Sequence, residues 1–344
     1  MDLNVKSPNV ALFGDLHLGI KSDSSNWHEI ALNWCDWFIA ELKSKDITEI
    51  IFLGDFFHNR SDVSVSTLHI ASLILDKLAD FNITMIVGNH CCFFKNRSDV
   101  HSLSLIKGRP NITVIDKNFQ TTLYGKECLF LPWGSEIQEN QKADYIFGHL
   151  EIQSFKVTYT KVCEHGFKTS DLFNHAKLIF SGHFHLREER KYKEGDIVYI
   201  GNPFEMDYGD LGSTKGYYIL NIPSGKYEFF ENTVSPKHLK VNLSELNSAA
   251  PARLSNNIVT VVVDQDIDAR DLDKITANIN ATNAPMSLAI DCSQQNQKIS
   301  VNETQKESTS SVDVAEMIGE FVNSLDVSNK SAVIEYCTDL INRV

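Results

Sequence analysis

The chain has 344 residues, of which 42% are hydrophobic, and a formal net charge of -13. Single hydrophobic cores stop growing at roughly 250–300 residues, so this length predicts more than one domain. The negative charge excludes a protein that coats nucleic acid through a broad basic surface, because such binding places many Lys and Arg side chains at phosphates. If DNA is the substrate, local basic loops, bound metal or a partner must supply the attraction.

The sequence begins MDLNVKSPNVALFG, which lacks the basic and hydrophobic regions of a secretory signal. It contains no run of about 18 apolar residues, which a membrane-spanning helix would need. Seven cysteines, scattered without a C-x-x-C pair, do not match a disulfide framework or a zinc knuckle. We therefore expect a cytoplasmic protein with reduced thiols and no membrane contact.

Short apolar runs alternate with longer amphipathic stretches from Val10 to Val87. Residues 27–42 and 65–79 repeat their apolar side chains at helical spacing, which predicts two helices that pack against a sheet. Strands joined by such helices are typical of a mostly parallel sheet. The sequence therefore belongs to the α/β fold class.

Beyond Ile112 the apolar runs are short and strand-like, as in CLFLPW, KLIFSGH and GYYILNI. This change predicts a second sheet that faces the first, in a four-layer α/β/β/α sandwich. We expect residues 1–235 to form this domain.

The composition changes again after Pro236. Residues 256–265, 268–281 and 286–292 read as strand, helix and strand, so we predict a small α/β capping domain over 236–292. The polar stretch 293–310 reads as a linker.

The last segment, 311–344, repeats apolar residues at helical spacing and predicts a helical tail. Residues 301–344 carry eight acidic side chains against three basic ones, so the tail should bind protein and not DNA. The sequence leaves open whether it docks on its own domain or on helices of a partner.

One construction recurs five times in the first 185 residues: an apolar run, a glycine, and then Asp, Asn or His. The five copies are VALFGDLH, IIFLGDFFH, TMIVGNH, DYIFGHL and KLIFSGHFH. Ligands of open α/β sheets bind outside the carboxyl ends of the strands, so these polar residues should surround one crevice. They are Asp15, His17, Asp55, Asn89, His149, His183 and His185.

This set of residues predicts a metal centre. Two carboxylates, one amide and four imidazoles, with Asp55 shared, fit two divalent ions about 3.5–4 Å apart. Imidazole and oxygen ligands without thiolate favour Mn²⁺, Fe²⁺ or Zn²⁺ over Ca²⁺. Such a centre is suited to the hydrolysis of phosphoesters.

The motifs GDLH, GDFFH, GNH, GHL and GHFH, in this order, resemble those of the calcineurin-like metallophosphoesterase family over residues 9–232. Within that family, GDFFHNR, YIGNPFEMDYGD and KGYYIL are similar to motifs of the SbcD-type DNA-repair nucleases. The length and the tail are similar to those of recombination endonuclease subunits of T-even-type phages. For a phage protein, the expected cytoplasmic location would be the cytoplasm of the host.

This resemblance implies roles for individual residues. Asp15, His17, Asp55 and His185 would hold one metal, and Asp55, Asn89, His149 and His183 the other. His90 would protonate the leaving oxygen, and His58 would support it. An imidazole titrates near neutral pH, where general acid catalysis is efficient. The ions would be Mn²⁺, with Mg²⁺, Fe²⁺ and Zn²⁺ as alternatives.

The resemblance also implies partners. DNA would be the substrate, an SbcC-type ATPase would bind the C-terminal helices, and helices near the nuclease site would form a homodimer. Four basic residues follow metal-bearing strands and are candidate DNA contacts: Lys21, Arg60, Lys95 and Arg97.

The leading hypothesis is thus a DNA nuclease that removes nucleotides from duplex ends and nicks single strands. A phosphatase or phosphodiesterase for small phosphoesters or phosphoproteins could use the same ions, although it would have little need for residues 236–344. A third hypothesis is a DNA-end-binding subunit with weakened catalysis, which the complete ligand set disfavours.

Cys91 is the departure from the family pattern, since an acidic residue usually follows Asn-His there. A thiolate is a soft ligand, and this position aims it away from Asn89, so we do not expect it to bind metal. We predict that Cys91 lies behind the ligands and orients one of them, in competition with a role as a small buried apolar residue.

Substitution Cys91→Asp tests this prediction. If the residue orients a ligand, metal occupancy or the hydrolysis rate should change by more than about twofold, because such contacts typically carry about 10–100-fold effects. Occupancy and rate within that margin would leave Cys91 with a packing role alone.

Overall fold

The computed structural model describes residue 3, residues 5–246 and 252–293, and residue 330. Its first sheet is mostly parallel, with two antiparallel strands at one edge. In spatial order the strands are β12 (Lys226–Glu231), β11 (Gly216–Asn221), β1 (Asn9–Phe13), β2 (Glu49–Phe52), β3 (Asn82–Ile86) and β4 (Ile112–Ile115).

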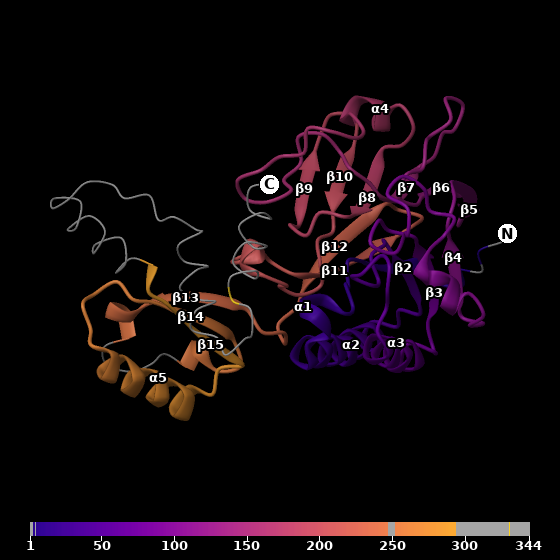
Figure 1. Ribbon diagram of the computed structural model, residues 1–344. Coiled ribbons are helices and arrows are strands. Elements are labelled where there is room, and N and C mark those ends of the chain that lie inside the picture. Colours follow the sequence, from indigo (N-terminus) through magenta and orange to yellow (C-terminus); the bar gives the residue numbers. More distant parts are fainter. Residues whose placement is uncertain (1–2, 4, 247–251, 294–329, 331–344) are drawn as a thin grey trace.

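Two helices, α2 (Ser25–Ser44) and α3 (Val65–Lys77), cover the outer face of this sheet (Figure 1). The stripe predicted on α2 is buried, and Trp34 and Phe38 pack their rings on Phe13 of β1. At the start of α3 the Ser64 hydroxyl accepts a hydrogen bond from the Thr67 amide at 3.1 Å, as N-cap residues do. Both predicted helices are confirmed.

The second sheet faces the first, and an apolar layer fills the space between them. In spatial order its strands are β5 (Phe119–Leu123), β6 (Lys126–Leu131), β7 (Tyr145–His149), β8 (Leu178–Gly182), β10 (Asp196–Tyr199) and β9 (Glu188–Lys191). The layer between the sheets includes Leu12, Leu53, Phe130, Phe147 and Phe180.

The predicted four-layer sandwich is confirmed, although its fourth layer is thin. The segment 150–176 covers the outer face of the second sheet with Ile152, Phe155 and Leu172, and it contains one short helix, α4 (Thr169–Phe173). Polar residues and Gly166 interrupt this segment, so it lacks the continuous apolar stripe of a longer helix.

The remaining helical elements are short, and those labelled η are 3₁₀-helices. They are α1 (Ile20–Asp23), η1 (Ser102–Ile106), η2 (Tyr208–Asp210), η3 (Leu243–Leu246) and η4 (Ala252–Leu254).

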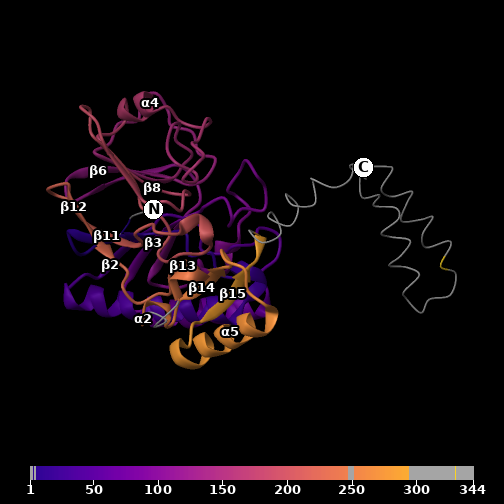
Figure 2. The ribbon, with the colours of Figure 1, turned by 90° about the vertical axis from the view of Figure 1, so that its left-hand side faces the viewer.

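A small α/β unit follows the sandwich and lies beside it in Figure 1, so that it stands in front of the sandwich in Figure 2. The predicted strand, helix and strand are β14 (Ile258–Val262), α5 (Ala269–Asn283) and β15 (Ser287–Asp291). The structure adds β13 (His238–Asn242), which pairs in parallel with β14. The exact boundaries 1–235 and 236–292 stay predictions.

Apart from Ser293 and Lys330, the predicted linker 293–310 and helical segment 311–344 lie outside the described residues. Among the helices that the structure does describe, none is long and apolar enough to cross a bilayer.

Candidate metal centre

The residues predicted to bind metal lie at the carboxyl ends of five strands from both sheets. Asp15 and His17 follow β1, Asp55 follows β2, and Asn89 follows β3. His149 ends β7, and the pair His183 and His185 follows β8. The structure brings all seven together at the place where the carboxyl ends of the parallel strands of both sheets lie.

One group of ligand atoms forms around Asn89. Its side-chain oxygen lies 2.8 Å from His149 Nε2 and 3.0 Å from His183 Nδ1. The carboxylate of Asp55 lies 3.2 Å from His149 Nε2. Asp55 and His149 are almost fully buried, so these atoms converge in a space with little access to bulk water.

A second group forms around His17. Its Nε2 lies 3.0 Å from His185 Nε2 and 3.7 Å from the Asp55 carboxylate, and Asp15 completes the group. Asp55 follows an inner strand of the first sheet and thus borders both groups, where a residue shared by two ions would have to lie.

The backbone around the ligands is unusual. Asp15, His17, Asp55 and His183 all have positive φ values, between 48° and 91°, which side chains other than glycine rarely adopt. Such strain is concentrated at functional sites, where surrounding contacts hold it in place. Here the Asp15 amide donates to Gly54 O at 2.8 Å and the His17 amide to Asp55 O at 3.0 Å.

Burial keeps most imidazoles of the site neutral. Burial holds the pKa of His17 well below its ordinary value and lowers that of His185 to about 4. Burial also opposes the charge of His149, yet the Asp55 carboxylate raises the pKa of His149 to about 9. Burial raises the pKa of Asp15 well above its usual range, with the Asp55 charge adding to the effect.

These residues fit divalent cations. With Asn89 Oδ1 toward the two imidazoles, an amide oxygen, a carboxylate oxygen and two ring nitrogens converge as electron-pair donors. Turning the amide over would let Nδ2 donate to His149 at 2.8 Å and Oδ1 accept from Arg60 at 2.8 Å. A cation requires the first orientation, because only the oxygen is a ligand.

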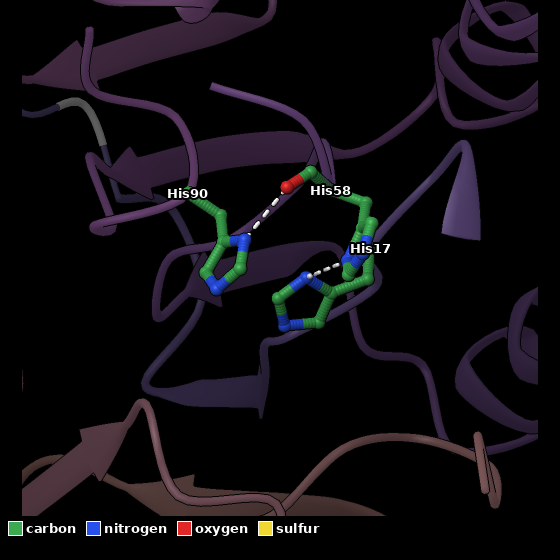
Figure 3. A group of neighbouring side chains, drawn as sticks. All are labelled: His17, His58 and His90. Carbon is green, nitrogen blue, oxygen red and sulfur yellow. Dashed lines mark hydrogen bonds between the residues drawn. The ribbon is translucent and has the colours of Figure 1, made fainter. Parts of the chain in front are cut away.

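Two further histidines, His58 and His90, lie beside His17 of this centre (Figure 3). His90 Nδ1 lies 2.6 Å from the backbone oxygen of His58, so Nδ1 carries the hydrogen and Nε2 is left available. The His58 ring stacks on that of His90, and its Nδ1 lies 3.3 Å from His17 Nδ1. His58 thus contacts His90 through its backbone carbonyl as well as through ring stacking, and its supporting role stays a prediction.

A family model of calcineurin-like phosphoesterases matches residues 8–187, which is more than half of the chain and spans all five strand ends. The chain belongs to the calcineurin-like phosphoesterase family. The predicted resemblance to that family is confirmed, and membership implies divalent metal ions.

The chain is also similar to individual known proteins. The chain is 27% identical over 348 residues to exonuclease subunit 1 of Enterobacteria phage T4, with 95% of this chain and 96% of that protein covered. It also matches a solved structure described as a novel archaeal phosphodiesterase, at 12% identity and a TM-score of 0.37, covering 65% of this chain and 99% of that one. The predicted similarity to T-even-type phage subunits is confirmed by the first match.

Cys91 lies in the apolar layer between the first sheet and its helices, with no exposed surface. Burial raises the pKa of its thiol to about 12, and the charge of Asp55 acts in the same direction. The thiol is therefore neutral. Among the described residues, Cys91 belongs to none of the three groups that could hold a metal ion in this phosphoesterase.

The four predicted DNA contacts differ in their surroundings. Arg60 approaches the Asn89 amide at the edge of the metal centre, and Lys21 is exposed on the turn after β1. Lys95 is also exposed, and its carbonyl accepts from Trp133 Nε1 at 2.7 Å. Arg97 instead pairs with the Asp99 carboxylate at 2.6 Å, which makes it a weaker candidate for a phosphate contact.

Sequence patterns did not point to two further residues beside the centre. The Trp133 ring packs on His183 with ring centroids 5.0 Å apart. Lys215 is buried and donates to His185 O at 2.7 Å and to Asp210 at 2.6 Å. Lys215 is the first residue of the KGYYIL motif, so the motif identified this segment but did not predict the contact of Lys215 with His185.

Gly88 offers a test of how closely the ligand loops must approach. A Cβ atom at Gly88 would lie 2.3 Å from Asp55 Oδ1 and 2.5 Å from its amide nitrogen, so Gly88→Ala must displace Asp55. We expect the affinity for Mn²⁺, measured by calorimetry, to fall by about tenfold or more.

Gly108→Ala is the matched control, because a Cβ atom there meets nothing within 4 Å. Circular dichroism should show both variants folded. Equal Mn²⁺ affinities for the two variants would contradict the assignment of Asp55 as a ligand.

Proposed function

We propose that the chain is the nuclease subunit of a DNA recombination and repair complex. It hydrolyses phosphodiester bonds with two divalent ions, preferably Mn²⁺, as an exonuclease on duplex ends and an endonuclease on single strands. The observation that carries this proposal is the extent of the similarity to the phage T4 exonuclease subunit. That similarity covers 95% of the chain and so runs well beyond residues 8–187 of the family model.

The ligand geometry supports the chemistry. Asp15, His17, Asp55 and His185 are proposed to hold one ion, and Asp55 with Asn89, His149 and His183 the other. Two divalent ions supply Lewis acidity at phosphorus when bound. Neutral imidazoles and the Asp55 carboxylate present their lone pairs toward the same space, as that role requires.

The residues of the chain itself would move the proton. His90 lies next to Asn89, and its amide donates to Asp55 Oδ1 at 2.8 Å, which fixes the loop against the centre. Because Nδ1 keeps its hydrogen on the His58 carbonyl, Nε2 of the doubly protonated ring is the atom that would give its hydrogen to the leaving oxygen, which leaves a neutral imidazole. Arg60, at the rim, would orient the phosphate.

Exposed apolar residues support the proposed homodimer. Val65 on α3 is 84% exposed, Phe93 is 55% exposed in the loop after β3, and Leu105 on η1 is 69% exposed. The Phe93 amide pairs with Val100 O at 3.0 Å, so this loop is ordered while its ring faces solvent. Contiguous apolar patches are typical of surfaces that another chain covers, and these three residues are the proposed members of one.

Nucleotide release from end-labelled linear duplex DNA in Mn²⁺ tests the proposed nuclease. We expect release by the wild type and a rate lowered by about 10²–10⁴-fold in His90→Ala, because a general acid contributes on that scale. The Mn²⁺ stoichiometry should be unchanged in the variant.

His175→Ala is the matched control. His175 belongs to the outer layer, and its Nδ1 also lies 2.7 Å from a backbone oxygen, that of Gln141. It should release nucleotides as the wild type does. Hydrolysis of a small phosphodiester without release from DNA would instead favour the phosphodiesterase alternative. Full activity of His90→Ala would overturn its role as the acid.

Removal of residues 311–344 tests the proposed partner. An SbcC-type ATPase should no longer co-purify with the shortened chain, because the apolar stripes of this segment are the proposed docking surface. Mn²⁺ binding should persist. Continued co-purification would contradict the assignment of this segment.

A further inference from the structure

The orientation of His183 is fixed from outside the metal centre. Its Nδ1 faces Asn89 Oδ1 at 3.0 Å, so this nitrogen is the one that would donate its lone pair to a cation. A neutral imidazole then carries its hydrogen on Nε2. That nitrogen points away from the centre and lies 3.5 Å from Glu151 Oε1.

Two neighbouring histidines are each oriented by a backbone acceptor on one ring nitrogen. His149 uses Nε2 toward the centre, and its Nδ1 lies 2.7 Å from Leu53 O. His90 is held in the same way by the His58 carbonyl. For His183 this place is taken by a carboxylate, the arrangement that raises the basicity of metal-binding histidines and holds their rings.

The backbone places the Glu151 carboxylate at this position. Glu151 follows His149 by two residues in an extended segment, so both side chains leave the chain on the same side. Its carbonyl accepts from the Phe167 amide at 2.8 Å. Gly166, with φ of 79°, passes so close that a Cβ atom there would lie 2.1 Å from Glu151 O.

The His183 ring also packs edge to face with His149, at 5.1 Å between ring centroids, and against two larger aromatic rings. Trp133 lies at 5.0 Å and Phe184 at 4.9 Å between ring centroids. These rings limit how far the imidazole can tilt, but they offer no acceptor for Nε2. The carboxylate is therefore the group that selects which nitrogen faces the centre.

We propose that Glu151 is a positioning residue that orients His183 toward the metal centre by accepting the hydrogen of Nε2. The inference rests on the proposed function, because it assigns His183 as a ligand. Glu151 does not touch the reacting atoms. It acts through the ring of His183 and through the tautomer of that ring.

Two substitutions and a control test this role. Glu151→Ala removes the acceptor, and Glu151→Gln keeps an oxygen acceptor without the charge. Glu164→Ala is the control, because Glu164 lines the same cavity of about 630 Å³ beside His183. The Glu151 side chain is 41% exposed, so all three variants should unfold at the wild-type denaturant concentration.

The readouts are Mn²⁺ titration by calorimetry and the visible absorption spectrum of the Co²⁺-loaded protein. In Glu151→Ala we expect one of the two ions to bind about 10–100-fold more weakly and the Co²⁺ bands of that site to shift. Glu151→Gln should be intermediate, and Glu164→Ala should match the wild type.

The outcomes separate this inference from the proposed function. If the wild type binds two ions and Glu151→Ala binds both with unchanged affinity and spectrum, Glu151 has no positioning role. If Glu164→Ala weakens binding equally, the effect is one of local charge, and the inference is wrong. A wild type that binds no divalent ion overturns the proposed function, and this inference with it.

Discussion

Two carboxyl groups, Asp15 and Asp55, lie buried beside each other at the site, where burial raises the pKa of Asp15 and the neighbouring imidazoles keep Asp55 charged. Burial of an unpaired carboxylate is strongly unfavourable, so positive charge must be supplied nearby. In the protein alone, His149 provides it through its raised pKa of about 9. Divalent ions would provide it in the active enzyme, which couples metal binding to the release of that proton.

Close approach of five loops is the geometric condition for this arrangement. Gly54 and Gly182 both lie against His149, where a Cβ atom would come within 2.2 Å and 3.1 Å of Nδ1, respectively. Four of the predicted ligands have positive φ, and backbone hydrogen bonds between these loops hold two of them, from the Asp15 amide to Gly54 O and from the His17 amide to Asp55 O. The strain is thus balanced by the packing of the two sheets, and the ligands are oriented before any ion arrives.

The same principle extends outward from the ligands. Lys215 is buried and fully engaged by the backbone oxygen of His185, Asn202 and Asp210, so the last ligand loop is tied to the edge of the first sheet. Farther out, the Glu205 carboxylate accepts from the His238 amide and joins the small α/β unit to the sandwich. A buried cation and a buried anion therefore anchor the two segments that follow the metal-binding strands.

The sequence by itself determined the fold class, the two main helices and the set of residues that meet at the centre. It did so because a glycine at the end of a strand and a spacing of two residues are local properties of the sequence. Parallel strands then place their carboxyl ends at the same edge of a sheet. Tertiary structure alone decided how those residues are held. Whether His58 supports His90 through its ring or its carbonyl, whether Arg97 is free or paired with Asp99, and which acceptor faces His183 all depend on loops distant in the chain. The direction of a side chain on such a loop is set by packing, for which the sequence carries no periodic signal.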